Sequence, residues 1–535
     1  MIYIVIIPNP GENLKGDSGN VRNFPSKHSE FRRTKIDGHK NCMLPVWFAM
    51  CVCSFLQIVF VESGRFVYNE TRNCALKFIR LQQNENSVVG LFYAQITERK
   101  HRCNANQGGD IVSERPITLP ISTAKELIDF AHAINKLHNE QQRDLAVTLT
   151  SDIDLTGVEW TPIGNEDIPF YGTFDGGGHT ISGLHIDKTE GGCCGLFGVC
   201  AGTIENLTVT GSITCVAADA HSAVGGIAGL VVGGHISNCA ADIVIDSNRL
   251  SLGMYVGGVV GQIKEGTIRC CRSSTRFEHV LGNFLYLGGV VGAAEDARVA
   301  HCIFDGSIQV LGGPGYYIDA GGVVGNVQGH STVVRCLNRG LVDAYNYDFE
   351  FAYVGGVVGH IDGDGVILES VNRGSVSGGC KAVGGIAGWI SMDHQGPDPL
   401  TVVDCCLTLG DVIQSPNSSG GSCGGIVGEI YNKPPDTTLL LVRNCVCLGS
   451  LILRDPAGRA HPIVAHADGA VFENNYFDQR LPIQGDGVPQ EQVAQGCTAW
   501  PAEKLLAELP ALDSRCIIGP DGALTVSNLE IGGGI

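Results

Sequence analysis

The stretch Gly257-Gly258-Val259-Val260-Gly261 decides the fold, because close copies of it recur along the chain. The copies share the pattern Gly-Gly-(Ile/Val)-(Ala/Val)-Gly and occupy residues 225–229, 257–261, 288–292, 321–325, 355–359, 384–388 and 424–428, with an earlier variant at 195–198. Gly195 and the second glycines stand at 195, 226, 258, 289, 322, 356, 385 and 425, so they are 31, 32, 31, 33, 34, 29 and 40 residues apart. Self-similarity at such a period indicates a solenoid, a propeller or another repeat array.

A row of cysteines keeps register with the glycine motifs. A cysteine stands four residues before another glycine at Cys302, Cys336, Cys406 and Cys445. Ser370 takes this position in one repeat, and Cys239 and Cys271 hold it without the glycine. We interpret the row as an inward stack of small, nearly apolar side chains, in preference to disulfides or a metal site.

The residues around each motif predict short strands. One and five positions past the second glycine the residue is nearly always aliphatic, whereas four past it has no fixed character, which is strand periodicity. An apolar residue two past it interrupts the alternation. Further short strands are predicted after each cysteine and before each motif, as in 307–310 and 254–256. Helical spacing is absent from the array.

Two or three short strands in about 31 residues fit one coil of a parallel β-solenoid. A β-propeller blade would need about 40–45 residues and four strands. The stacked coils predict glycine where corners need a positive φ or a close approach of backbones. The polar inserts at 391–399 and 431–438 are expected in surface loops.

Composition separates the chain into two regions and excludes several classes of protein. The 73 glycines do not follow the three-residue period that collagen needs, so the chain is not a collagen. The net charge of −19 argues against a nucleic-acid binder, which usually has a basic face. Residues 1–115 hold 8 glycines and a net charge of +5, whereas residues 116–535 hold 65 glycines and a net charge of −24. We therefore expect a boundary near Pro116, with residues 1–115 left unassigned.

Residues 43–61 form an uncharged, apolar stretch of 19 residues within the first region. Arg32, Arg33, Lys35 and Lys40 precede it, so it resembles an export signal or a signal anchor. A buried segment is the alternative interpretation.

Both ends of the array carry signals for capping helices. Thr123 and Glu126 form a capping-box pattern before a helix whose apolar face holds Leu127, Phe130, Ala131 and Ile134. Such a helix would cover the first coil. Strands are predicted at 146–149 and 180–186, and a second short helix is predicted to start at Pro501. Residues 511–535 are assigned to a C-terminal tail.

Residues 117–510 resemble bacterial surface proteins with GLUG repeats. The resemblance rests on motifs at 149–155, 160–164, 170–176, 179–181, 195–198 and 204–207 and on the glycine motifs from Gly225 to Gly428. It implies a right-handed parallel β-helix that is secreted or attached to the cell wall and is adhesin-like, and some members are joined to IgA-cleaving metallopeptidases. The high cysteine content departs from the usual composition of exported proteins.

No sequence motif names a catalytic, cofactor-binding or metal-binding residue. A His-Glu-x-x-His metallopeptidase motif is missing, and we interpret His461 and His466 as a loop pair. The stretch 362–365 (Asp-Gly-Asp-Gly) resembles the start of a calcium loop but lacks its terminal glutamate. Cys193, Cys194 and Cys200 lack paired metal-ligand spacing. We predict no cofactor and no metal.

Parallel β-helices also include polysaccharide lyases and glycosidases, and a glycosidase would need two carboxylates at a fixed separation. Asp152, Asp154 and Asp175 are close in sequence, but we expect them to form turns. The repeated Asn-Arg pairs at 338–339 and 372–373 would stack in adjacent coils, and an arginine can serve as the base of a lyase. A solvated outer row is the favoured interpretation of these pairs.

The sequence therefore predicts a non-catalytic β-solenoid at a bacterial cell surface or outside the cell. It would act as an adhesin-like binding or scaffold module for glycans or proteins, with no nucleic-acid partner and with membrane contact only through residues 43–61. The alternative is a carbohydrate-active β-helix enzyme, either a polysaccharide lyase or a glycosidase.

Overall fold

The computed structural model of the 535-residue chain describes residues 117–507, apart from fifteen gaps, together with short strands at either end. The gaps are 138–141, 189–191, 216–221, 247–253, 279–283, 313–316, 347–350, 393–399, 416–419, 433–438, 455–457, 482, 485–495, 502 and 506. Contacts divide the chain into two units, Met1–Gln107 and Gly108–Ile535.

The first unit contains a small antiparallel sheet. Its strands are β1 (Tyr3–Ile7), β2 (Gln57–Glu62) and β3 (Arg65–Phe66). Residues 43–56 of the predicted export or anchor segment lie outside the described residues, and residues 57–61 belong to β2. No helix in the described part of the chain has the length and apolarity needed to cross a membrane.

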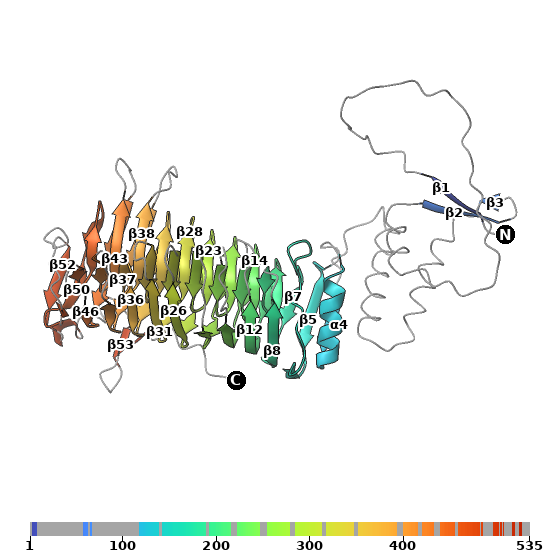
Figure 1. Ribbon diagram of the computed structural model, residues 1–535, viewed down its shortest axis with the longest axis horizontal. Helices are drawn as coiled ribbons and strands as arrows, with labels where there is room; N and C mark the ends of the chain where they lie inside the picture. The colour runs from blue at the N-terminus through green and yellow to red at the C-terminus, as the bar shows by residue number, and fades with distance from the viewer. Residues whose placement is uncertain are drawn as a thin grey trace, which may run out of the picture. The chain divides into compact units, whose positions relative to one another are not determined.

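The second unit is a parallel β-solenoid, which confirms the predicted fold class (Figure 1). Two sheets flank the glycine motif in every coil. The leading sheet contains β9 (Cys193–Cys194), β13 (Ser222–Gly225), β17 (Met254–Gly257), β22 (Phe284–Gly288), β27 (Tyr317–Gly321), β32 (Ala352–Gly355), β37 (Ala382–Gly384), β42 (Ser422–Gly424) and β47 (Arg459–His461). The following sheet contains β10 (Phe197–Cys200), β14 (Ala228–Val232), β18 (Val260–Lys264), β23 (Val291–Glu295), β28 (Val324–Gln328), β33 (Val358–Asp362), β38 (Ala387–Met392), β43 (Val427–Asn432) and β48 (Val464–Ala467).

Two further sheets complete each coil. The third sheet contains β4 (Ile117–Ile121), β5 (Leu145–Leu149), β7 (Thr173–Asp175), β11 (Thr203–Glu205), β15 (His235–Ser237), β19 (Thr267–Arg269), β24 (Arg298–Ala300), β29 (Thr332–Val334), β34 (Val366–Leu368), β39 (Leu400–Asp404), β44 (Leu439–Arg443) and β49 (Val471–Glu473). The fourth sheet contains β6 (Ile153–Asp154), β8 (Thr180–Lys188), β12 (Thr208–Cys215), β16 (Ala240–Asp246), β20 (Arg272–Ser273), β21 (Arg276–Glu278), β25 (Ile303–Phe304), β26 (Ser307–Gly312), β30 (Leu337–Asn338), β31 (Leu341–Asn346), β35 (Val371–Asn372), β36 (Val376–Gly379), β40 (Leu407–Thr408), β41 (Val412–Gln414), β45 (Val446–Cys447), β46 (Leu451–Leu453), β50 (Asn475–Asp478), β51 (Ile483–Gln484) and β52 (Cys497–Trp500).

The prediction of two or three strands per coil was too low. The leading, following and fourth sheets match the predicted strands. In the third sheet, the strand predicted at 146–149 corresponds to β5, whereas the short strands just before each cysteine were missed. Its strands are mostly three residues long, too short to show alternation. The pairings on the two sides of Gly195 differ by one residue. Cys194 pairs with Val224, which sets Gly195 beside the first glycine, Gly225, whereas Phe197 pairs with Ala228, which sets it beside the second glycine, Gly226, as predicted.

A backbone corner at the glycine motif accompanies the two consecutive apolar residues that follow the second glycine. The N–H groups of Val259 and Val260 both donate to the carbonyl of Val290 in the next coil, at 2.9 and 3.0 Å. The register is the same on both sides of the corner, because Gly257 pairs with Gly288 and Val260 pairs with Val291. The alternation therefore changes at a bend between two strands, and both valines are fully buried.

The motif glycines provide close backbone approach, which was one of the two predicted reasons for them. A Cβ on Gly355 would lie 1.8 Å from the carbonyl oxygen of Val358. The positive φ angles occur instead at the corner before the cysteine position, at values between 52° and 56°. The residues there are Asn206, Asn238, Cys270, His301, Arg335, Glu369, Cys405, Asn444 and Asn474.

The cysteine row is buried, as predicted, and its six thiols are free: Cys239, Cys271, Cys302, Cys336, Cys406 and Cys445. Each thiol donates to the carbonyl two residues earlier; Cys302, for example, bonds Ala300 at 3.3 Å. Ser370 makes the same bond to Leu368 at 2.9 Å. The cysteine position therefore favours a small side chain that can donate a hydrogen bond.

One further coil has lost the glycine signature. His461 pairs with Gly424, and Val464 pairs with Val427, so the stretch His461-Pro462-Ile463-Val464-Ala465 takes the place of the motif. Only the two aliphatic residues, Ile463 and Val464, keep the pattern. The coil could therefore not be identified from its glycines.

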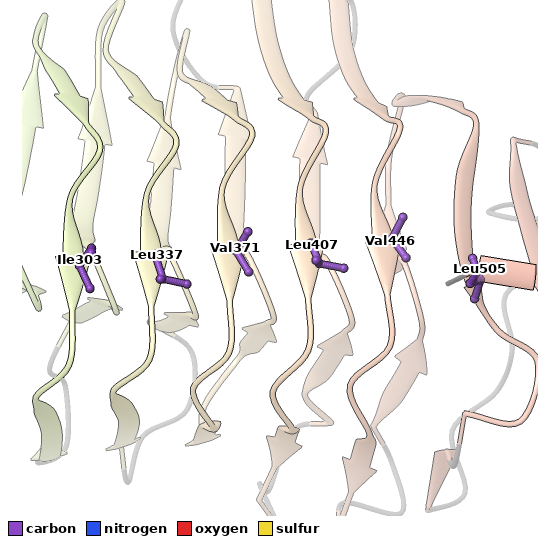
Figure 2. Close-up of a cluster of buried hydrophobic side chains, with 6 residues drawn as sticks. All are labelled: Ile303, Leu337, Val371, Leu407, Val446 and Leu505. Carbon is purple, nitrogen blue, oxygen red and sulfur yellow. The ribbon is translucent and has the colours of Figure 1, made fainter. Parts of the chain in front are cut away.

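Helical segments lie near both ends of the solenoid, as predicted. Helix α4 (Ala124–Ile134) lies at the N-terminal end of the solenoid (Figure 1). Thr123 caps it with a full capping box, and the Phe130 ring packs against Phe170 and Phe174 of the first coils. At the other end residues 503–505 are helical. Leu505 continues a buried row formed by Ile303, Leu337, Val371, Leu407 and Val446 (Figure 2). In the tail, β53 (Cys516–Ile518) pairs with β54 (Leu524–Val526).

Candidate functional site

The site is a seam where outward side chains of the leading and following sheets meet. In β33, for example, His360 faces away from the core while its neighbour Ile361 is fully buried in it. The leading row contains Cys193, Ala223, Tyr255, Tyr286, Asp319, Tyr353, Ala382, Ser422 and Arg459. The following row contains Val199, Leu230, Gln262, Ala293, Asn326, His360, Trp389, Glu429 and His466. We call these two rows the seam.

Aromatic rings stack along and across the seam. The Tyr255 and Tyr286 rings are 5.2 Å apart and stacked, and Tyr353 stacks on Trp389 across the seam at 4.7 Å. Trp389 in turn stacks on Tyr431 at 6.2 Å. Because coils repeat at about 4.8 Å, rings at one register stand one above the next.

An exposed aromatic rim borders the seam, two residues before the leading row. Phe284 is 53% exposed and Phe351 is 51% exposed. Tyr317 lies between them, with ring separations of 6.0 Å to Phe284 and 6.3 Å to Phe351. We call Phe284, Tyr317 and Phe351 the rim. Phe284 and Phe351 thus present apolar ring surface to solvent on either side of the half-buried Tyr317, an arrangement typical of binding sites.

A buried polar cluster lies beneath the rim. The Asp319 carboxylate is fully buried; its Oδ2 accepts from Asn326 at 2.6 Å and lies 3.1 Å from Nδ1 of His360. On the other side of the ring, Nε2 of His360 lies 2.8 Å from Oγ of Ser391. Burial raises the pKa of Asp319, against the opposing charge of His360. Burial also raises the pKa of Tyr317, whose hydroxyl lies 2.9 Å from Nδ1 of His360.

Charged side chains follow the cluster toward the C-terminal coils. Ser422 donates to Glu429 at 2.7 Å, and Lys381 lies 3.8 Å from the same carboxylate. The Lys381 ammonium also lies 5.9 Å from the Trp389 ring centre, within cation–π range. The seam therefore offers donors, acceptors and ring faces side by side.

A depression of about 710 Å³ lies at the N-terminal end of the seam. Val199 and Leu230 of the following row line it together with Arg143, Glu166 and Tyr171. The guanidinium of Arg143 lies 5.4 Å from the Tyr171 ring centre. Ring, charge and aliphatic surface occur together here as they do along the seam.

The three carboxylates weighed for glycosidase chemistry lie outside the seam. Asp154 accepts from the N–H of Thr156 and Asp175 from that of Gly177, both at 2.9 Å, so these two form the predicted turns. Asp152 instead accepts from the N–H of Thr180, 28 residues away, at 2.9 Å. The N–H of Thr180 lowers the pKa of Asp152. The hydroxyl of Thr156, which donates to Asp154 at 2.6 Å, lowers the pKa of Asp154 together with the Thr156 N–H.

The predicted solvated outer row of Asn-Arg pairs is wrong for the asparagines. Asn338 and Asn372 are fully buried, and Nδ2 of Asn338 donates to Oδ1 of Asn372 at 2.8 Å. Asn338 stands two residues past Cys336, so its side chain points to the same side of the strand, into the core. Arg339 does face solvent, with its Nη1 at 3.9 Å from Asp305.

The histidines interpreted as a loop pair lie on strands β47 and β48 instead. Nδ1 of His461 accepts from the N–H groups of Ile463 and Val464, and burial lowers its pKa to about 4. His466 belongs to the following row and lies 2.8 Å from Arg459. The missed coil carries both residues.

The remaining metal candidates are separated. Cys194 and Cys200 are fully buried, whereas Cys193 lies in the seam. Asp362 lies 3.5 Å from Ser391, and Asp364 lies 3.6 Å from His330. Across the residues that the structure describes, no three His, Cys, Asp or Glu side chains are grouped to hold a metal ion.

The seam was not predicted as a site, although the sequence contains a signal for it. The residues four positions past the second glycine vary in character and were not assigned a role, and these residues form the following row. The tyrosines at 255, 286 and 353 share the leading position. Variable polar and aromatic residues in a fixed register of a repeat array indicate a row outside the aliphatic core, and here many of them are buried against one another.

Comparisons with known proteins give short and partial matches. No family model matches the chain. A protein of Evansella cellulosilytica, provisionally named as a Gly-rich membrane protein, is 34% identical over 112 residues, which are 19% of this chain and 12% of that protein. Halomucin of Haloquadratum walsbyi is 34% identical over 128 residues, 22% of this chain and 1% of halomucin. The chain thus spans a small part of these relatives.

A solved structure is also similar. It is a protein of Bacteroides ovatus provisionally identified as an immunoglobulin A1 protease, with 16% identity and a TM-score of 0.35. The match covers 78% of this chain and 94% of that one.

Proposed function

We propose that the solenoid is a module at the cell surface or outside the cell that binds polysaccharide chains along the aromatic seam. The observation that carries the proposal is the rim, in which the exposed rings of Phe284 and Phe351 flank the half-buried Tyr317 beside a row of hydrogen-bonding groups. The negative face of an aromatic ring attracts the C–H groups on the face of a sugar ring. The polar side chains of the seam match sugar hydroxyls, which both donate and accept.

The geometry of the repeat supports an extended ligand. The rim carries one ring in each of three successive coils, with separations of 6.0 and 6.3 Å, a spacing comparable to the length of one sugar residue in an extended chain. A long chain running parallel to the solenoid axis would therefore meet the same kind of contact repeatedly. Repeated weak contacts add up to useful affinity on one ligand.

Charge and the named relatives support the location and the ligand class. The net charge of −19 disfavours nucleic acid as the partner. The two relatives are named as a Gly-rich membrane protein and as halomucin, which supports a surface or extracellular location. The GLUG resemblance of residues 117–510 points the same way and stays a prediction.

The test is affinity electrophoresis of the full chain in gels that contain xylan, pectin, β-glucan or mucin. We expect retardation by at least one polymer, and at least about tenfold weaker binding for the double variant Phe284→Ser/Phe351→Ser, which corresponds to about 1.4 kcal/mol. The matched control is Leu400→Ser/Val471→Ser, which removes two side chains that are each 43% exposed on the third sheet. Equal retardation of the two double variants, or no retardation of the wild type, would overturn the proposal.

A further inference from the structure

Three side chains from successive coils form a linear relay at the seam. Asp319 lies in β27, His360 in β33 and Ser391 in β38. The distances along the relay are 3.1 Å from Oδ2 of Asp319 to Nδ1 of His360 and 2.8 Å from Nε2 of His360 to Oγ of Ser391. The carboxylate and the hydroxyl thus contact opposite nitrogens of one imidazole ring, as in hydrolases with a serine nucleophile.

The charge on Asp319 sets the tautomer of His360. Nδ1 lies 3.1 Å from the Asp319 carboxylate and 2.9 Å from the Tyr317 hydroxyl oxygen. When Asp319 is ionised, a lone pair on Nδ1 would face the carboxylate, so we assign the proton to Nδ1, where the carboxylate and the Tyr317 oxygen can both accept it. Nε2 is then the acceptor, and the hydroxyl of Ser391 donates to it. The ring is in the state needed to remove a proton from serine.

The surroundings give the relay a rigid base and an outer end. Asn326 donates to the Asp319 carboxylate at 2.6 Å, and Tyr353 packs on the His360 ring at 5.1 Å. Ser391 stands two positions beyond Trp389 of the following row and pairs with Tyr431, which is 39% exposed, whereas Ser391 itself is 8% exposed. The fully buried acid is thus at the inner end of the relay, and Ser391 keeps a small exposed surface at the other end.

A purely structural cluster would be expected to satisfy all its polar atoms. Here Oδ1 of Asp319 and Oδ1 of Asn326 are buried and have no hydrogen-bond partner among the described residues. Burying a carboxylate next to a histidine carries a desolvation penalty, which incomplete hydrogen bonding leaves partly uncompensated. Groups of this kind concentrate at functional sites.

We propose that Asp319, His360 and Ser391 hydrolyse carboxylic esters bound in the seam. Oγ of Ser391 attacks the ester carbonyl carbon while its proton passes to Nε2 of His360. The C–O bond of the ester then breaks, His360 returns the proton to the departing alcohol oxygen, and the acyl group stays on Ser391. Water attacks this acyl-enzyme with His360 again as the base, which releases the carboxylic acid and restores Ser391.

The substrate class follows from the leaving group and from the seam. An alkoxide leaves more readily than an amide anion, so esters suit the relay better than peptides do. If a polysaccharide occupies the rim, its O-acyl groups would lie beside Ser391. This choice of substrate rests on the proposed function. The relay adds a reaction to a module that the sequence predicted to be non-catalytic.

Two small probes test the relay independently of glycan binding. The full chain is treated with a fluorophosphonate, and the labelled peptide is mapped by mass spectrometry; its hydrolysis of p-nitrophenyl acetate is then followed. We expect the label on Ser391 and at least about a 100-fold lower hydrolysis rate for Ser391→Ala, His360→Gln and Asp319→Asn. The matched control Ser377→Ala removes a serine bonded to Asp343 on the fourth sheet and should keep the full rate.

The outcomes separate the two proposals. Label elsewhere or no label on the wild type, or unchanged hydrolysis by Ser391→Ala, overturns the relay and leaves polysaccharide binding intact. Should a variant lose its β-sheet circular dichroism, the mapped label on the wild-type chain still decides. Acetate release from acetylated xylan by the wild type, lost in Ser391→Ala but not in Ser377→Ala, would establish the glycan ester as the substrate. If esters are cleaved but no polymer binds, only the proposed function fails.

Discussion

Asn338 donates a hydrogen bond of 2.8 Å to Asn372, its equivalent in the next coil, and both side chains are fully buried. The ladder stops there, because Thr408 pairs with Asn372 in the following coil. Nδ2 of Asn372 and Oγ1 of Thr408 are therefore both buried without a hydrogen-bond partner among the described residues. One substitution at this position is therefore enough to extend or interrupt a buried row of hydrogen-bonded asparagines.

Thr408→Asn should stabilise the protein by about 1 kcal/mol, because it supplies the acceptor that Nδ2 of Asn372 lacks. The free energy of unfolding from urea denaturation measures the effect. Thr408→Val, which keeps the shape and removes the hydroxyl, serves as the control and should leave Asn372 unsatisfied. A Thr408→Asn variant no more stable than the wild type would show that the unpaired donor is not a defect.

Gly355→Ala should destabilise the protein by about 3 kcal/mol. The new Cβ would lie 1.8 Å from a backbone oxygen, that of Val358, which can move only by disturbing neighbouring coils. Gly178→Ala is the control, since its Cβ would meet no atom within 4 Å and only the φ of +78° is unfavourable. The midpoints of thermal unfolding compare the two, and equal losses would refute close approach as the reason for the motif glycines.

His301→Gly should stabilise the protein by about 1 kcal/mol. His301 has a φ of 55°, a left-handed conformation that costs an ordinary residue about 1–2 kcal/mol and glycine almost nothing. His235→Gly, at an exposed position of strand β15 without a positive φ, should instead lower the stability. Chemical denaturation of both variants checks the prediction, which fails if both lose stability alike.

The stability of the solenoid should fall as the pH rises from 9 to 12. Burial raises the pKa of Cys200, Cys423 and Cys447 to about 12, from an ordinary value of 9.0. Above pH 9 the unfolded thiols ionise while the folded ones keep their protons, so each contributes a loss of about 1.4 kcal/mol per pH unit. Urea denaturation at pH 8 and pH 10 measures the slope.

Cys423→Ala provides the control for this pH dependence. It should lower the stability at pH 8 by leaving a cavity, and it should also make the loss between pH 8 and pH 10 smaller by about 1.4 kcal/mol. A slope unchanged by the substitution would mean that the Cys423 thiol is not protected by burial.

The cysteine row should resist thiol reagents in the native state. Cys302 and Cys336 are fully buried, whereas Cys270 and Cys405 at the preceding corner are half-buried. Iodoacetamide should therefore modify Cys270 and Cys405 first and reach the row only after denaturation. Peptide mapping by mass spectrometry measures the order, and a disulfide within the row would contradict it.

Much of the fold was predictable because every coil repeats the same local pattern. The spacing of the glycine motifs predicted the coil, and the aliphatic residues one and five past Gly258 predicted the core rows. The capping box at Thr123 predicted helix α4. Most of the third sheet was not predictable, since strands such as Thr267–Arg269 are too short to show a period. The coil at His461 was missed because its glycines are replaced.

The sequence by itself determined that this chain is a stacked parallel solenoid with buried thiols, because stacking turns each recurring residue into a row. Only the tertiary structure decided which variable residues face one another. The corner at the glycine motif directs the following row toward the leading row, and this brings together Asp319, His360 and Ser391, which lie 41 and 31 residues apart. The reason is physical: a repeat fixes which positions share a row, whereas the backbone geometry at the corner fixes which two rows meet.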